Sequence, residues 1–166
     1  MPFFLVKTIA TVFAAMCLIV AGDTAGKLLT AAGFSPFFVA WARFAIAAVF
    51  LLPLSGLRRA ELPNLLDRGI LLRAALIAGG ISCILTALRT EPIANVFGAF
   101  FISPVVSYFL SALLLKERIS ASRTMMLLSG LLGVILVVKP GFGATAGMGF
   151  ALLAGCLHGS YLVATR

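Results

Sequence analysis

The sequence predicts an all-α protein that crosses a membrane several times. Of its 166 residues, 62% are hydrophobic and only 11% are charged, and the mean hydropathy is +1.17. A soluble domain carries roughly 45–50% apolar and about 25% charged residues, so too few charges are present here to cover a surface in water. The apolar residues also gather into long runs. These observations argue against a soluble enzyme, a disordered chain and a disulfide-rich secreted module, and they leave a polytopic membrane protein.

Six apolar segments are long enough, or nearly long enough, to span a bilayer, which takes roughly 20 helical residues. The fifth is the shortest, and it approaches a full span if it begins near Ser120. The connections between the segments are short, which suits antiparallel neighbours in a helical bundle. The six transmembrane helices are expected over residues 5–32, 36–54, 65–88, 92–115, 124–138 and 147–165.

Proline, capping residues and glycine mark the helix ends. Pro36 and Pro92 each stand at a first helical position, where the missing N–H of proline is harmless. Asn64 followed by Asp67 predicts an N-cap and a first-turn acid for the third helix. The Lys-Pro-Gly run at 139–141 is expected to end the fifth helix.

The basic residues are unevenly divided between the two sets of connections. The chain has 13 Lys and Arg residues and 5 Asp and Glu residues, which gives a net charge of +8. Because these basic residues lie mostly between apolar runs, they indicate membrane orientation and no nucleic-acid partner. Nine lie on one side, whereas the other side has Arg89 and Lys139. The positive-inside rule therefore predicts a multi-pass protein of the cytoplasmic membrane, with the N-terminus in the cytoplasm. The nine are Lys7, Arg58, Arg59, Arg68, Arg73, Lys116, Arg118, Arg123 and Arg166.

The last apolar segment repeats part of the pattern of the first. A shift of 139 residues places Cys156 on Cys17 and Leu157 on Leu18. A repeat that restarts after five helices is inverted in the membrane, and inverted repeats are typical of secondary transporters with substrate sites near the midplane. We therefore expect a first repeat over residues 5–140, and the truncated start of a second repeat over residues 147–166.

Three segments carry motifs of a known family. The second helix reads SPFFVAWARFAIAA, in which an aromatic-x-Arg-Phe core follows a proline and precedes small residues. The fourth reads PIANVFGAFFISPVVSYFLSALLLKERIS, with a mid-helix proline at Pro104 and a terminal glutamate at Glu117. The fifth contains LLSGLLGVILVVKPG, which has a Gly-x-x-Gly-Val ending. Together these segments resemble the EamA family of the drug/metabolite transporter superfamily.

The resemblance implies a carrier of ten helices in two inverted repeats, which moves small metabolites or drugs across the cytoplasmic membrane. It covers the first five-helix repeat and the start of the second. The first helix departs from the family pattern, because Ala21-Gly22-Asp23 stands where Trp-Gly is usual. We expect transport by alternating access, with export as the direction. The missing helices would come from a longer chain, from a second copy of this chain or from a separate half-transporter.

Small or polar residues recur at four-residue steps along the fourth helix, from Asn95 to Ser111. They indicate either close helix packing or the wall of a substrate cavity. Asn95 is the strongest cavity candidate, because an amide that faces lipid leaves its hydrogen-bonding groups unmet. A small cavity with few charges favours a neutral or zwitterionic metabolite. The candidates for the substrate cavity are Asn95, Ser103, Tyr108 and His158.

Three ionisable residues lie near the outer ends of the first two helices. Intramembrane charges usually face the bundle interior and pair with one another. We therefore expect an Asp23–Arg43 or an Asp23–Lys27 ion pair at the outer mouth, where it would act as a gate. The alternative is that Lys27 and Arg43 extend to the membrane interface.

Three further residues have two interpretations each. His158, the single histidine, lies near the midplane and suits proton coupling, or it is a structural histidine. Pro104 clashes with the carbonyl group of Phe100 in a regular helix, so it forms either a static kink or a hinge. For Glu117, at the cytoplasmic end of the fourth helix, the family resemblance implies a structural or a gating role.

Motifs for catalysis and for metal binding are absent from the sequence. It contains no GxSxG, HExxH or GxxxxGK[ST] pattern, and its three cysteines lie in separate apolar runs. We therefore expect no enzymatic activity, no metal and no cofactor. Two alternatives to a transporter remain. One is a non-transporting scaffold or fragment that needs a partner, and the other is a membrane-integral enzyme built on Asp23, Arg43, Arg89 and Glu91.

Overall fold

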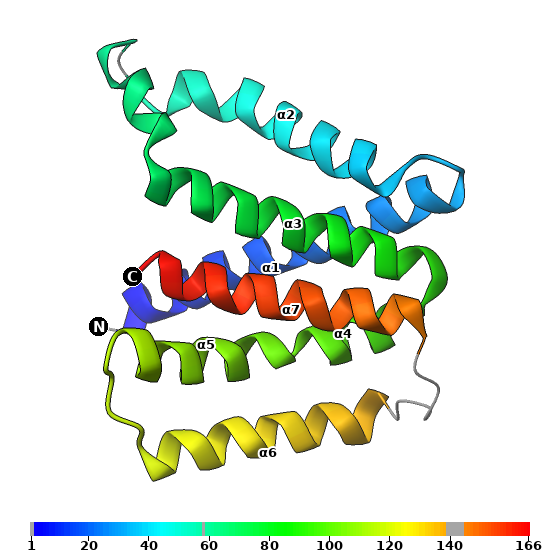
Figure 1. The fold of residues 1–166 in the computed structure, drawn as a ribbon, viewed down its shortest axis with the longest axis vertical. Helices are drawn as coiled ribbons and strands as arrows, with labels where there is room; N and C mark the ends of the chain where they lie inside the picture. Colours follow the sequence, from blue (N-terminus) through cyan, green and yellow to red (C-terminus); the bar gives the residue numbers. More distant parts are fainter. Residues whose placement is uncertain (1, 58, 139–144) are drawn as a thin grey trace.

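Helices run back and forth between two ends of the molecule (Figure 1). This computed structural model describes residues 2–57, 59–138 and 145–166. The expected turn after residue 139 therefore lies outside the described residues. The helices are α1 (Pro2–Ala31), α2 (Pro36–Leu54), the 3₁₀-helix η1 (Arg59–Leu66), α3 (Arg68–Thr90), α4 (Ile93–Phe100), α5 (Ile102–Leu114), α6 (Ala121–Val138) and α7 (Ala146–Ala164).

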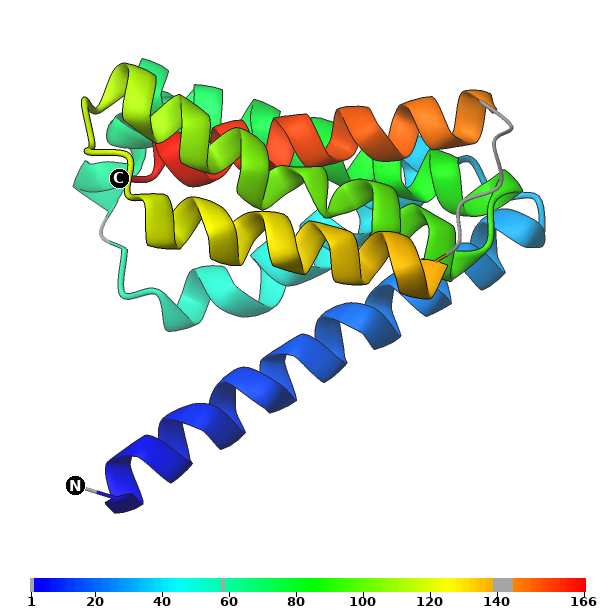
Figure 2. The ribbon, with the colours of Figure 1, turned by 90° about the horizontal axis from the view of Figure 1, so that it is seen from below.

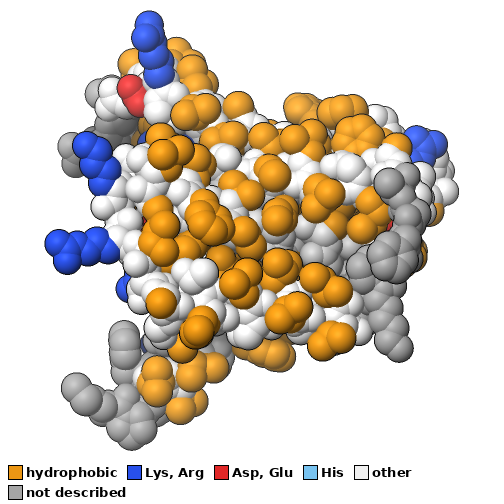
Figure 3. Space-filling model, turned by 60° about the horizontal axis from the view of Figure 1, so that its bottom comes forward, with side chains coloured by type: hydrophobic (Ala, Val, Ile, Leu, Met, Phe, Trp, Pro, Cys, Tyr) orange, Lys and Arg blue, Asp and Glu red, His pale blue; other side chains and the backbone are white. Residues whose placement is uncertain are grey.

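The predicted fold class is confirmed. Within the described residues, five helical segments are long and apolar enough to cross a membrane, namely α1, α2, α3, α4 with α5, and α7, while α6 supplies a shorter apolar helix. Large hydrophobic side chains are exposed along these helices, and hydrophobic side chains are spread over the face drawn in Figure 3. Such a surface is unsuited to water but matches the hydrocarbon core of a bilayer.

The two ends of the bundle differ in charge. One end, here called the basic end, carries most of the described Lys and Arg residues of the helix termini and connections, including Arg68, Arg73, Arg118, Arg123 and Arg166. The opposite end carries Lys27 and Arg89. Figure 3 shows this asymmetry for one face of the molecule.

The third helix begins later than predicted. Residues 59–66 form η1, in which the carbonyl group of Asn64 accepts a hydrogen bond from the N–H of Asp67 at 3.1 Å. Asp67 is the N-cap of α3, and its carboxylate accepts a hydrogen bond from the N–H of Gly69 at 2.9 Å. The predicted cap at Asn64 was therefore wrong, because the preceding 3₁₀ turns move the start of the helix to the next acceptor side chain.

The fourth predicted helix is interrupted at Phe101, between α4 and α5. The N–H of Phe101 bonds to the carbonyl groups of both Phe97 and Gly98, at 3.1 and 3.2 Å, so the last turn of α4 tightens. Pro104 follows three residues later, and it has no N–H to offer the carbonyl group of Phe100. The two helices still form one apolar span over Ile93–Leu114. The proline therefore accompanies a break between two helices. The sequence had predicted a single helix with a kink or hinge at this proline.

Helix α7 packs against α3, α4 and α5 and lies at the centre of the structure (Figure 1). Its glycines allow this close approach. A Cβ atom at Gly155 would lie 2.9 Å from the carbonyl oxygen of Phe100, and one at Gly159 would lie 2.7 Å from that of Ser103. Small residues at four-residue spacing are the usual means of bringing membrane helices into contact. The core around them consists of Ile84, Ala87, Leu88, Val96, Ala151 and Ala154.

Helix α1 diverges from the other helices (Figure 2). Residues 5–21 are exposed, and burial begins near Asp23 and recurs at Gly26 and Thr30. The contacts of α1 are with α2 and α3. Helix α1 is therefore attached to the bundle near the opposite end and separated from it toward the basic end.

Candidate functional site

Two of the predicted site residues meet inside the bundle, although they are 55 positions apart in the chain. The hydroxyl group of Ser103 on α5 lies 2.9 Å from Nδ1 of His158 on α7. Ser103 is buried, whereas His158 is half-buried. The imidazole ring lies beside the rings of Phe100 and Tyr161, with centroid separations of 5.1 and 6.1 Å. The close contact between α5 and α7 at Gly159 places this polar pair in an otherwise apolar environment.

Asn95 lies apart from this pair, on α4. It is half-buried and lines a cavity of about 160 Å³ between α4, α6 and α7. Its amide has no hydrogen-bond partner among the residues that the structure describes. The other lining residues of this cavity are Gly98, Ala99, Val134, Ile135, Met148 and Leu152.

Tyr108 lies nearer the basic end, where it holds the beginning of α6 against α5. Its hydroxyl group accepts a hydrogen bond from the N–H of Ser120 at 3.1 Å and lies 2.9 Å from the hydroxyl group of Thr124. Tyr108 lines a second cavity, which does not include Asn95, Ser103 or His158. The structure thus distributes the four cavity candidates over three places and brings only Ser103 and His158 into contact.

Among the described residues, the charged side chains near the opposite end form one ion pair. Nη1 of Arg43 lies 2.6 Å from Oδ1 of Asp23, and the side chain of Asp23 is 6% exposed, compared with 31% for Arg43. Of the two pairs considered for Asp23, the structure therefore contains the one with Arg43. Lys27 instead donates a hydrogen bond from Nζ to the backbone carbonyl of Glu91, at 2.6 Å.

Glu91 connects three parts of the bundle at this end. Its N–H bonds to Ala87 and ends α3, its carbonyl group accepts the bond from Lys27 on α1, and its carboxylate accepts a bond from Thr145, the N-cap of α7. From the sequence, Glu91 was considered only as part of an enzyme site. Its position directly before Pro92, where helices α3 and α4 meet, was the sequence signal that could have indicated a structural role for Glu91.

Glu117 lies at the basic end and pairs with the last residue of the sequence. Nη1 of Arg166 donates to Oε1 and Oε2 of Glu117 at 2.8 and 3.0 Å. This ion pair joins the segment between α5 and α6 to the end of α7. Both residues line the cavity that contains Tyr108, together with Pro104, Ser107, Ser111, Arg123, Leu127 and Leu162.

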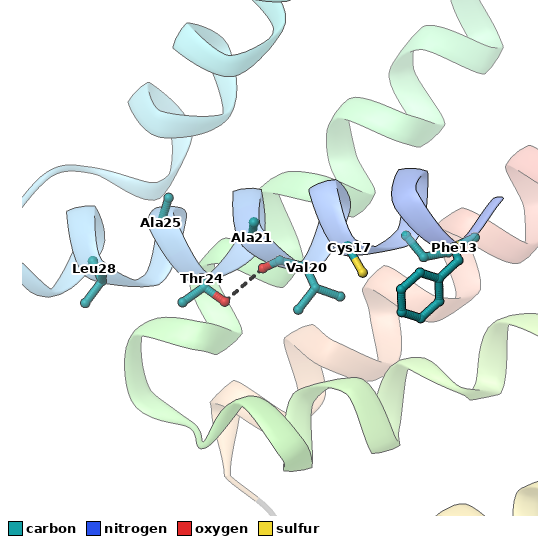
Figure 4. A pocket seen from close by; sticks show the side chains of 8 residues that line it. Phe13, Cys17, Val20, Ala21, Thr24, Ala25 and Leu28 are labelled. Atoms are coloured by element: carbon teal, nitrogen blue, oxygen red, sulfur yellow. Dashed lines mark hydrogen bonds between the residues drawn. The ribbon is translucent and has the colours of Figure 1, made fainter. Parts of the chain in front are cut away.

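A larger hollow, of about 640 Å³, follows one face of α1 (Figure 4). All of its lining residues belong to this one helix, from Phe13 to Leu28. Its polar side chain, Thr24, donates a hydrogen bond to the carbonyl group of Val20 in the same helix, at 2.8 Å. The hollow is therefore an open, apolar helix face without a free polar group to orient a ligand.

Two other residues that shape the interior were not singled out from the sequence. Gly155 and Gly159 form a Gly-x-x-x-Gly pattern, which is a visible signal for close helix contact. The partner of that contact cannot be read from the pattern. It is the junction of α4 and α5, whose backbone lies against both glycines.

Comparison with known proteins gives one result. The sequence profile of the EamA-like transporter family matches residues 6–139. No curated protein and no solved structure matches the chain. The matched range covers most of the sequence and runs from α1 through α6. The resemblance seen in the second, fourth and fifth predicted helices is thus confirmed, and the chain belongs to the EamA-like transporter family.

Proposed function

We propose that the protein is a permease that moves a small metabolite or drug across the cytoplasmic membrane by alternating access, in the direction of export. The observation that carries the proposal is the family match over residues 6–139. In this proposal the basic end faces the cytoplasm, as the positive-inside rule predicts. The few charges in the interior favour a neutral or zwitterionic substrate.

The different packing of α1 at its two ends supports alternating access. Near the opposite end, α1 is held by the Asp23–Arg43 pair and by the bond from Lys27 to Glu91. Toward the basic end, residues 5–21 of α1 are exposed (Figure 2). This arrangement corresponds to a carrier that is closed on the outer side and open toward the cytoplasm. Release to the outside would then require these outer contacts to break.

Helix α7 is proposed to be the first helix of an inverted second repeat. The remaining helices would come from a longer chain, a second copy or a separate half-transporter, and the substrate would lie between the two repeats. On the side of this chain, we propose that Asn95 and the Ser103–His158 pair are the polar groups that face the substrate.

Transport can be tested before the substrate is identified. The protein is reconstituted into liposomes loaded with a mixture of amino acids, sugars, nucleosides and organic acids, and their loss is followed by mass spectrometry. We expect at least one neutral or zwitterionic compound to leave faster than from protein-free liposomes. If every compound leaves at the protein-free rate, in reconstitutions of both the single chain and its crosslinked dimer, transport by this chain alone or by two copies of it is contradicted, and the interpretation as a scaffold or fragment that needs a partner is favoured.

Replacing Asn95 by leucine is expected to lower transport roughly 2- to 10-fold, the range that corresponds to one lost hydrogen bond of about 0.5–1.5 kcal/mol. Expression should be unchanged, because the amide has no partner within the described residues. The measurement is the initial rate of efflux from the liposomes. Ala94→Leu, an exposed position on the same helix, is the matched control. Full activity of Asn95→Leu would remove Asn95 from the substrate path.

Replacing His158 by glutamine tests the proton-coupling interpretation. If His158 carries the coupled proton, the variant should transport at a rate that no longer changes over the pH range in which the rate of the unmodified protein changes. Glutamine keeps a polar group near the hydroxyl of Ser103, so packing between α5 and α7 should be preserved. A pH profile identical to that of the unmodified protein would identify His158 as structural.

A further inference from the structure

The cavity at the basic end has three charged side chains in its lining, whereas the cavity between α1 and α2 has one, Arg43. It has a volume of about 350 Å³ and lies between α5, α6 and α7. The cavity near Asn95 and the hollow along α1 have no charged lining residue. Here Glu117, Arg123 and Arg166 are among the lining residues, and Ser107 and Ser111 line the cavity from α5.

The charges of this cavity do not balance. Arg166 uses Nη1 to bind both carboxylate oxygens of Glu117, so these two charges offset each other. Arg123 has no ion-pair partner among the described residues. It lies in the first turn of α6, where the helix dipole adds a partial positive charge. The side chains that line the cavity therefore carry an excess of positive charge, which favours an anion.

A buried hydroxyl group in the same cavity wall lacks a partner. Ser111 is 2% exposed, and its Oγ is the one buried side-chain oxygen or nitrogen in the described residues that has no hydrogen bond. Leaving such a group unsatisfied costs about 1–3 kcal/mol, and nearly all buried polar groups in proteins are therefore paired. An acceptor oxygen of a bound ligand would satisfy this donor, and an anionic oxygen would satisfy Arg123 as well.

We infer that this cavity binds an anionic group, a carboxylate or a phosphate, through Arg123 and the hydroxyl group of Ser111. Tyr108 lines the same cavity, but its hydroxyl group is already engaged with Ser120 and Thr124, so it shapes the site and holds the loop in place. Leu127 and Leu162 supply apolar walls beside the charged opening. The inference goes beyond the transport proposal, because binding is measurable without transport.

An anionic group has two sources at this end of the molecule, a soluble anion or the headgroup of an acidic lipid. The first arm of the test measures thermal unfolding of delipidated protein in sodium phosphate and in sodium chloride at equal ionic strength. The second arm compares the same protein in nanodiscs of phosphatidylglycerol and of phosphatidylcholine. We expect the unfolding temperature to rise by about 2–4 °C in at least one arm. A rise in the first arm identifies a soluble anion, and a rise in the second alone identifies a lipid headgroup.

The rise in unfolding temperature should be lost in Arg123→Gln. Arg123 is exposed, so its replacement is expected to leave the fold intact. Arg118→Gln removes the same charge from the α5–α6 connection outside the cavity lining, and it should keep the full rise. Ser111→Ala should unfold at the same or a higher temperature without ligand and show a smaller rise with it. The inference is overturned if neither arm raises the unfolding temperature, or if Arg123→Gln responds like the unmodified protein.

Discussion

Gly159→Ala is expected to lower the unfolding temperature of the protein by roughly 2–12 °C, which corresponds to an overpacking cost of about 1–3 kcal/mol. The added Cβ would lie 2.7 Å from the carbonyl oxygen of Ser103 and 2.9 Å from Cβ of Val106. Neither atom is the end of a flexible side chain, so relief requires α7 to move away from α5. Such a movement would also separate His158 from Ser103.

Gly149→Ala is the matched control on the same helix. A Cβ at Gly149 would meet nothing within 4 Å, and alanine is favoured over glycine in a helix by up to about 1 kcal/mol. The control should therefore unfold at the same or a slightly higher temperature. Both variants are measured in the same detergent by the fluorescence of Trp41, the single tryptophan. If Gly159→Ala is as stable as Gly149→Ala, the close contact between α5 and α7 is contradicted.

Arg43→Met is expected to destabilise the protein by about 3 kcal/mol, because it leaves the buried carboxylate of Asp23 without a counter-charge. The side chain of Asp23 is 6% exposed, so water cannot replace the lost guanidinium group. The estimate is taken from the lower end of the range for buried pairs, since Arg43 itself keeps 31% exposure. The measurement is again the shift in unfolding temperature, converted to free energy.

A double-variant cycle separates the pair from the packing of Arg43. Asp23→Asn combined with Arg43→Met removes both charges, and we expect it to recover a large part of the loss caused by Arg43→Met alone. Arg89→Met is the control for removing a cation at the same end, since Arg89 is exposed. Additive effects of Asp23→Asn and Arg43→Met would show that the two side chains do not interact.

Hydropathy and the pairing rule for intramembrane charges predicted the parts of the structure that depend on composition alone. The apolar runs gave the positions of the helices to within a few residues, and a buried carboxylate required a partner such as Arg43. The helix positions and the pairing of the carboxylate both follow from the free-energy cost of exposing a polar or charged group to hydrocarbon. This cost does not depend on which helices are neighbours.

The remaining features depend on geometry between segments. The cap of α3 moved from Asn64 to Asp67 because a 3₁₀ turn comes first. Tyr108 was a candidate for the substrate cavity, and the sequence did not indicate that its hydroxyl group accepts a hydrogen bond from the N–H of Ser120, which lies 12 residues further along the chain. Neither outcome has a signal in local sequence, because each depends on how a connection folds back on its helix.

Helix α1 is held near one end, through Asp23 and Lys27, and its remaining described length extends away from the bundle. About 22 residues separate Lys27 from the beginning of the described side chains at residue 5, which is roughly 33 Å of helix at 1.5 Å per residue. A rotation of about 10° around Lys27 would displace the far end by roughly 6 Å, close to the length of one helical turn. Because these contacts lie near one end of α1, a small rotation of the helix there becomes a displacement of several ångströms near the basic end.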